Sequence, residues 1–122
     1  MSEHTEQQAV CQYLDTAYPD ALYHANPNGA WLAGNKGQRM GQMRKLKGEG
    51  LLPGVSDLFI AEPRAPYHGF YLEMKDVGGA KPSENQVWFI AQAEARGYFT
   101  AVAYGFDEAK PLIDSYLTGK GA

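Results

Sequence analysis

The sequence predicts an α/β fold in which a mixed β-sheet is flanked by helices. Apolar residues recur at helical spacing near both ends of the chain, and short runs rich in aromatic and branched residues lie between them. The resulting order of helix, strands, helix, strand and helix excludes an all-helical or all-strand fold. With 122 residues, of which 44% are hydrophobic, the chain is expected to form a single domain over residues 1–122.

The first helix is predicted over residues 3–17 and ends before Pro19. Its apolar stripe consists of Ala9, Val10, Tyr13, Leu14 and Ala17. Glu6 lies three residues before Ala9 and four before Val10, so its carboxylate projects near the edge of that stripe. The positive end of the helix dipole attracts acids in a first turn. That attraction does not explain why Glu6 projects from the same side of the helix as the apolar stripe. We therefore favour a functional role for Glu6.

A basic segment follows the strand that we expect at residues 22–25 and the turn at residues 26–29. Residues 38–47 are rich in helix formers and bracketed by glycines, which predicts a short basic helix with mobile ends. No acid occurs from Ala21 to Gly48, although the net charge of the chain is -3. This stretch holds five of the eleven basic residues, namely Lys36, Arg39, Arg44, Lys45 and Lys47. A solvated helix face would account for them, but the lack of a balancing acid favours phosphate contact.

Two strands are predicted at residues 57–61 and 69–75, with a proline-containing loop between them. Alternation along the second strand sends Phe70, Leu72 and Met74 to one face and Tyr71, Glu73 and Lys75 to the other. If the two strands are adjacent, Asp57 lies near Glu73. Two close carboxylates repel each other unless a cation lies between them, and Mg²⁺ or Mn²⁺ prefers such oxygen ligands.

Lys75 shares a face with Glu73, so its ammonium could activate water and stabilise charge on a phosphate. By itself, an Asp followed at a distance by Glu-x-Lys is a weak pattern. It often arises by chance, and an exposed face with an ion pair explains it.

The last third of the chain predicts a helix, a strand and another helix. Ser83 opens the first helix with Gln86 as its capping-box partner, and Gly97 ends it. The apolar side of that helix is expected to contain Val87, Ile90, Ala91 and Ala93. A strand follows at residues 100–104, and Asp107 is expected to cap the last helix, in whose first turn Pro111 is tolerated.

Several classes of protein are disfavoured. Cys11 is the only cysteine, which excludes an intrachain disulfide and a thiolate zinc site and fits a reducing, cytoplasmic setting. The polar first residues and the lack of an apolar run of about 18 residues argue against secretion and membrane insertion. His4, His24 and His68 lack the close spacing that two histidine ligands of one metal site usually have. We interpret Trp31, Trp88 and the tyrosines as core or interface residues rather than base-stacking platforms.

Three stretches resemble the VRR-NUC family of the PD-(D/E)XK nuclease superfamily: residues 45–60 (KLKGEGLLPGVSDLFI), the strand GFYLEMK and the later SENQ. The resemblance runs from Glu6 to about Tyr104. The family's Gly-Val-Pro-Asp turn reads Gly54-Val55-Ser56-Asp57 here, and its Glu-x-Lys reads Glu73-Met74-Lys75. Ser56 makes the turn less rigid than the family's proline would, but it removes no metal ligand.

The resemblance implies an α-β-β-β-α-β core in which Asp57, Glu73 and the Met74 carbonyl bind Mg²⁺ or Mn²⁺. Lys75 and Gln86 complete the implied catalytic set, and Glu6 supports a second metal ion or its water shell. For Gln86, a capping role alone explains the residue about equally well.

The function that we expect from this resemblance is metal-dependent DNA endonuclease activity. Single-domain members resemble Holliday-junction resolvases in size, which favours branched DNA as the substrate and a homodimer as the assembly. The alternatives are a nuclease for flaps or nicks in repair and an inactive nucleic-acid-binding module. A purely structural domain would leave Glu6 and the acid-free basic segment unexplained.

Overall fold

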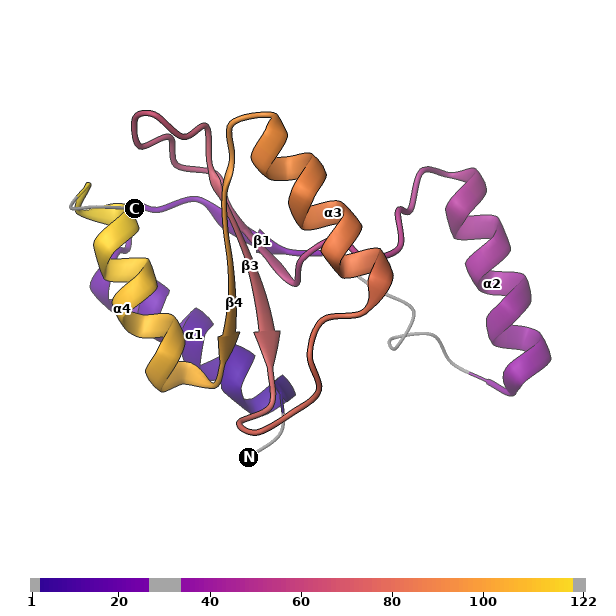
Figure 1. The fold of residues 1–122 in the computed structure, drawn as a ribbon. Helices are drawn as coiled ribbons and strands as arrows, with labels where there is room; N and C mark the ends of the chain where they lie inside the picture. Colours follow the sequence, from indigo (N-terminus) through magenta and orange to yellow (C-terminus); the bar gives the residue numbers. More distant parts are fainter. Residues whose placement is uncertain (1–2, 27–33, 120–122) are drawn as a thin grey trace.

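The computed structural model of the chain describes residues 3–26 and 34–119, and Figure 1 shows its elements. In order they are α1 (Glu3–Ala17), β1 (Tyr23–Ala25), α2 (Lys36–Gly48), β2 (Leu58–Ile60), β3 (Phe70–Lys75), α3 (Glu84–Ala95), β4 (Phe99–Tyr104) and α4 (Phe106–Leu117). Most of the turn predicted at residues 26–29, and Trp31, lie outside the described residues. Within the described part of the chain, no helix has the length and apolar character needed to cross a membrane.

The described strands form one mixed sheet in the order β1-β2-β3-β4. β2 runs antiparallel to both β1 and β3, whereas β3 and β4 are parallel. A parallel pair needs a long crossover, and α3 provides it. The predicted mixed sheet flanked by helices is therefore confirmed.

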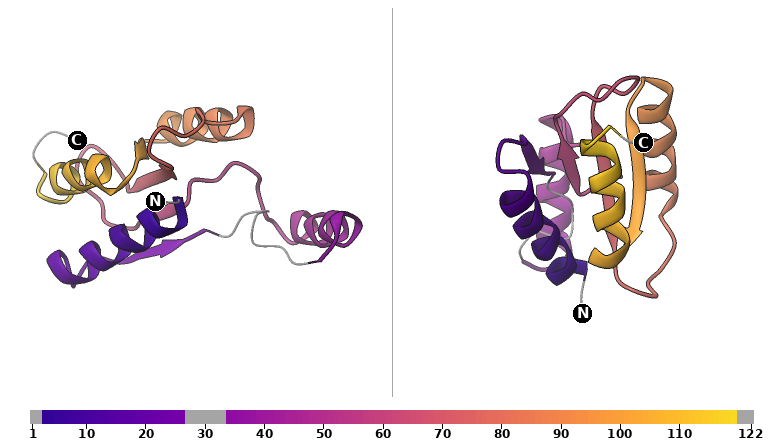
Figure 2. Two further views of the ribbon diagram at one scale, coloured as in Figure 1. Left: turned by 90° about the horizontal axis from the view of Figure 1, so that it is seen from below. Right: turned by 90° about the vertical axis from the view of Figure 1, so that its left-hand side faces the viewer.

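The hydrophobic core lies on one face of this sheet, under α1 and α4. Figures 1 and 2 show these two helices side by side, with α3 across the sheet from them. The fully buried core side chains include Val10, Leu14, Leu58, Ile60, Phe70, Leu72, Met74, Ile113 and Tyr116. The face predicted for Phe70, Leu72 and Met74 is thus the core face, which leaves Tyr71, Glu73 and Lys75 on the face toward α3.

The apolar side predicted for α3 is less buried than an apolar stripe usually is. Only Ala93 of this helix is buried, whereas the Val87 side chain is 56% exposed. Figure 2 shows α2 standing apart from the sheet and from α3. The helical period identifies an apolar stripe but not what covers it.

The predicted cap of the last helix is wrong. Gly105, with a φ of 95°, is the N-cap residue of α4, and Asp107 lies inside the first turn. The Glu6 carboxylate from α1 takes the expected place of the cap, because its Oε2 accepts a hydrogen bond from the Phe106 N–H at 3.2 Å. An acid from another helix thus satisfies a backbone donor at the start of α4.

Candidate active site

Asp57 and Glu73 lie on neighbouring strands of the sheet. Leu58 of β2 pairs with Leu72 of β3, so one step further along this antiparallel pair places Asp57 opposite Glu73. The residues are only 5% and 1% exposed. The predicted proximity of the two carboxylates therefore follows from the strand register.

The Asp57 side chain takes the place of a backbone acceptor at the end of β2. Its Oδ2 accepts a hydrogen bond from the Met74 N–H at 2.7 Å. The Ser56 carbonyl instead accepts a hydrogen bond from Asn26 Nδ2 at 2.9 Å. In a strand, the N–H and C=O of one residue point to the same side, so the Met74 carbonyl also faces the Asp57 side of β3.

Gly54 brings the turn before Asp57 against the start of α3. A Cβ at Gly54 would lie 2.3 Å from the Asn85 carbonyl oxygen, and the φ of Gly54 is +93°. Both the backbone conformation and the close approach therefore require glycine. The Gly54 contact fixes Asp57 relative to Gln86, the next residue of α3.

Gln86 joins Lys75 to Glu73. Its Oε1 accepts hydrogen bonds from Lys75 Nζ and from the Ser83 N–H, each at 2.9 Å. Its Nε2 donates to Glu73 Oε2 at 3.0 Å, and Lys75 Nζ lies 3.9 Å from the same oxygen. The capping role and the site contact proposed for Gln86 are therefore both present. Whether Gln86 takes part in catalysis stays a prediction.

Burial is the main influence on the Asp57 carboxyl, and it raises the pKa above the usual value for aspartate. The Met74 N–H, the Glu73 carboxyl and the Lys75 ammonium act in the opposite direction without cancelling the effect. An ionised pair at this position requires positive charge between the two groups. Lys75 supplies part of that charge from one side.

The donor atoms at this position fit a hard divalent cation. Two carboxylates and a backbone carbonyl offer oxygen alone, and Mg²⁺ typically keeps several waters and takes only one or two protein carboxylates. Within residues 3–26 and 34–119, no cluster of three or more His, Cys, Asp or Glu side chains is close enough to hold a metal ion. Metal binding by Asp57, Glu73 and the Met74 carbonyl stays a prediction.

Glu6 lies beside the end of β4 rather than in a three-carboxylate cluster. The residue is 5% exposed, and its carboxylate both caps α4 and lies near Gly105, whose added Cβ would be 3.3 Å from Glu6 Oε1. This structural role explains the side of α1 from which Glu6 projects. A role in supporting a second metal ion stays a prediction.

The predicted basic residues lie on α2, none of whose residues is buried. The helix begins with a complete capping box between Asn35 and Gln38, and Lys45 and Lys47 occupy its last turn. Figure 1 shows α2 set apart from the sheet. All five of its basic side chains are exposed, as phosphate contact requires, although exposure alone also fits a solvated face.

Ser56→Ala is expected to stabilise the protein. Ser56 is 1% exposed, and its Oγ has no hydrogen-bond partner among the described residues. Removal of a buried, unsatisfied hydroxyl should raise the free energy of unfolding by about 1 kcal/mol and Tm by about 4 °C. The matched control is Ser83→Ala, which should lower Tm, because Ser83 Oγ accepts the Gln86 N–H at 3.2 Å. Thermal melts in which both variants lose stability would contradict this prediction.

Comparison with known proteins places the fold. No protein-family model and no curated protein matches the chain. A solved structure described as a "VRR_NUC domain protein" is 24% identical and superposes with a TM-score of 0.77, covering 97% of this chain and 89% of that one. The chain therefore has the fold of a VRR_NUC domain protein, as the sequence resemblance predicts.

Proposed function

We propose that this protein is a divalent-metal-dependent nuclease that hydrolyses phosphodiester bonds in DNA. The observation that carries the proposal is the pairing of the buried Asp57 and Glu73 carboxylates beside the Lys75 ammonium. The fold shared with a VRR_NUC domain protein supports it. An inactive binding module would not require this combination, because paired buried carboxylates cost free energy and do not attract phosphate.

Each group has a proposed role in hydrolysis. Asp57, Glu73 and the Met74 carbonyl would hold Mg²⁺ or Mn²⁺, which would supply Lewis-acid activation of the phosphate and of water. Lys75 faces the reacting phosphate, where its ammonium orients the attacking water and stabilises the developing negative charge. Gln86 positions Lys75 through the 2.9 Å hydrogen bond to its Nζ. Glu6 supports this end of the sheet by capping α4.

The triple variant Arg44→Ala/Lys45→Ala/Lys47→Ala tests whether α2 binds the DNA backbone. We expect weaker binding to all DNA sequences alike and a salt dependence that is flatter by up to about one unit for each phosphate that these side chains bind. Fluorescence anisotropy over a series of salt concentrations measures both. The control Arg44→Lys/Lys45→Arg/Lys47→Arg keeps the charge and should keep the slope. An unchanged slope in the alanine variant would identify α2 as a solvated face.

Within the nuclease function, we propose branched DNA as the substrate and a homodimer as the active assembly. The part of the chain that the structure describes offers one candidate metal site, whereas a four-way junction presents two equivalent phosphates. A second subunit would hold the second site at high effective concentration and favour paired cuts. The alternative is a nuclease that acts on flaps or nicks, for which one subunit suffices.

A cleavage panel separates these possibilities. Four-way junction, flap, nicked duplex and single strand are each incubated with Mg²⁺, Mn²⁺ or EDTA, and sedimentation gives the assembly. Preference for the junction by a dimer supports the resolvase function. A monomer that prefers flaps or nicks would leave the nuclease in place and reject the resolvase. DNA binding without cleavage of any substrate would indicate the inactive module.

A further inference from the structure

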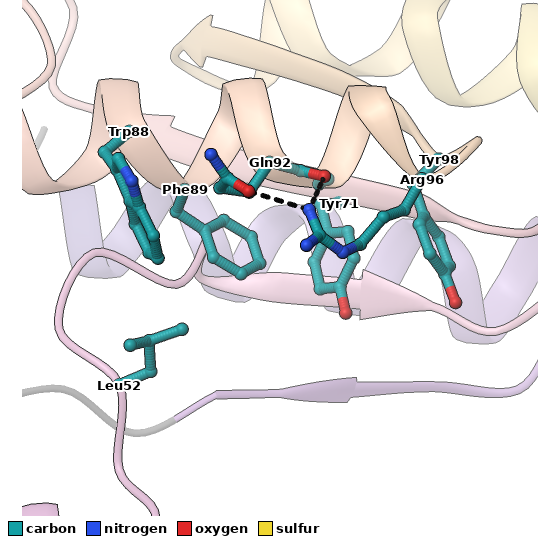
Figure 3. Close-up of a pocket in the computed structure, with 8 residues that line it drawn as sticks. Leu52, Tyr71, Trp88, Phe89, Gln92, Arg96 and Tyr98 are labelled. Carbon is teal, nitrogen blue, oxygen red and sulfur yellow. Dashed lines mark hydrogen bonds between the residues drawn. The ribbon is translucent and has the colours of Figure 1, made fainter.

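A pocket lined by aromatic side chains lies on the α3 side of the sheet. It has a volume of about 310 Å³, and we call it the aromatic pocket; its lining includes Leu52, Tyr71, Trp88, Phe89, Arg96 and Tyr98. Figure 3 shows Trp88, Phe89 and Arg96 projecting from α3, with Phe89 and Arg96 near Tyr71 of β3 and Leu52 across from Trp88.

The aromatic pocket adjoins the candidate active site. Tyr71 lies two residues before Glu73 on the same face of β3, which corresponds to about 7 Å along a strand. On α3, Phe89 of the pocket follows Gln86 of the site by three residues, a spacing that places both on one side of the helix. A DNA strand with its phosphate at Lys75 would therefore bring the base of a neighbouring nucleotide within reach of the pocket.

The side chains of the pocket fit a ligand that has a flat ring with a negatively charged group close to it. The Trp88 residue is 51% exposed and Leu52 is 44% exposed, so neither serves as an ordinary core residue. Phe89 packs edge-to-face on Tyr71 with 5.0 Å between the ring centroids, so two aromatic rings of the lining already contact each other. Of the side chains that line the pocket, Arg96 alone is charged.

Arg96 is held in position at the opening. Its Nη1 donates to the Gln92 carbonyl at 3.0 Å and to Gln92 Oε1 at 2.8 Å. Neither bond neutralises the guanidinium, because both acceptors are uncharged. The positive charge thus remains available to a ligand phosphate or to the face of a base.

We propose that the aromatic pocket holds one unpaired nucleobase of the DNA, stacked against Trp88. This inference rests on the nuclease function proposed above and adds a substrate feature to it: a nucleotide out of the duplex next to the cleaved bond. A nucleotide combines the flat ring and the negative charge that the aromatic side chains and Arg96 of the pocket match. Trp88 is then a base-stacking platform, in place of the core or interface residue that the sequence indicates.

Binding in EDTA tests the pocket separately from cleavage. The probes are a labelled oligothymidylate and an abasic strand of equal length, which carry the same phosphates but differ in bases. Trp88→Ala should weaken binding of the oligothymidylate about tenfold and leave the abasic strand unchanged. Trp88→Phe, which keeps a ring, should recover most of the affinity. In a Trp31→Phe background, the fluorescence of Trp88 should be quenched by the oligothymidylate and not by the abasic strand.

Three results would overturn the pocket proposal. These are equal losses for both probes, no loss for either, or a change in sedimentation of Trp88→Ala without DNA, which would assign the surface to a second copy of the chain. Base-dependent binding in a protein that cleaves nothing in Mg²⁺ would support the pocket and reject the nuclease. DNA cleavage by a protein that binds both probes equally would support the nuclease and reject the pocket.

Discussion

Asp57→Asn and Glu73→Gln are each expected to lower the rate of DNA cleavage about a thousandfold, the equivalent of about 4 kcal/mol in the activation barrier. Each change replaces a charged metal ligand by a neutral amide of nearly the same shape. In Asp57→Asn, the side-chain amide oxygen can still accept the Met74 N–H, so the end of β2 should remain in place. Single-turnover cleavage in Mg²⁺ measures the loss.

The controls for this pair are Asp20→Asn and Glu94→Gln, which make the same chemical changes at exposed positions. Both should cleave at the wild-type rate. Thermal melts in EDTA should show that the site variants are as stable as the wild type or more stable, because one buried charge is removed from a pair. Site variants that are folded and cleave as fast as the controls would show that Asp57 and Glu73 are not the metal ligands.

Lys75→Ala is expected to lower the cleavage rate about a hundredfold, because the ammonium no longer stabilises charge in the transition state. The change also removes the 2.9 Å hydrogen bond to Gln86 Oε1. Gln86 keeps its hydrogen bonds with Ser83 and Glu73, so α3 should stay in place. We expect the loss in kcat rather than in the affinity for DNA.

Lys110→Ala provides the charge-matched control for this prediction. Lys110 lies on α4 and pairs with Asp114 at 3.1 Å, on the core side of the sheet rather than at the site. Its replacement should leave kcat unchanged. If Lys75→Ala weakened only DNA binding, and to the same extent as removal of one α2 charge, Lys75 would bind phosphate without a chemical role.

The arrangement of Asp57, Glu73 and Lys75 could be predicted from the sequence because it follows from local rules. Alternation along residues 69–75 fixes which side chains share a face, and a short connection makes two neighbouring strands pair. The register then places Asp57 opposite Glu73. The capping box at Ser83 likewise depends on residues three apart.

The features that the sequence did not predict depend on contacts between distant residues. Glu6 replaces Asp107 as the cap of α4 across one hundred positions of the chain, and no local pattern indicates such a partner. The need for glycine at Gly54 arises from the Asn85 carbonyl, which only the folded chain brings close. The aromatic pocket arises in the same way, because periodicity predicts the apolar residues of α3 but not which of them, such as Trp88, stay exposed in the folded chain.

The most direct test of the central claim is the initial rate of DNA cleavage as a function of Mg²⁺ concentration, for the wild type and for Glu73→Gln side by side. The wild type should be inactive in EDTA, gain activity with added Mg²⁺ and reach a plateau. The variant should stay near the baseline throughout the same range, while binding the DNA. Full cleavage by the wild type in EDTA, or equal metal-dependent rates for both proteins, would contradict a metal-dependent nuclease centred on Asp57 and Glu73.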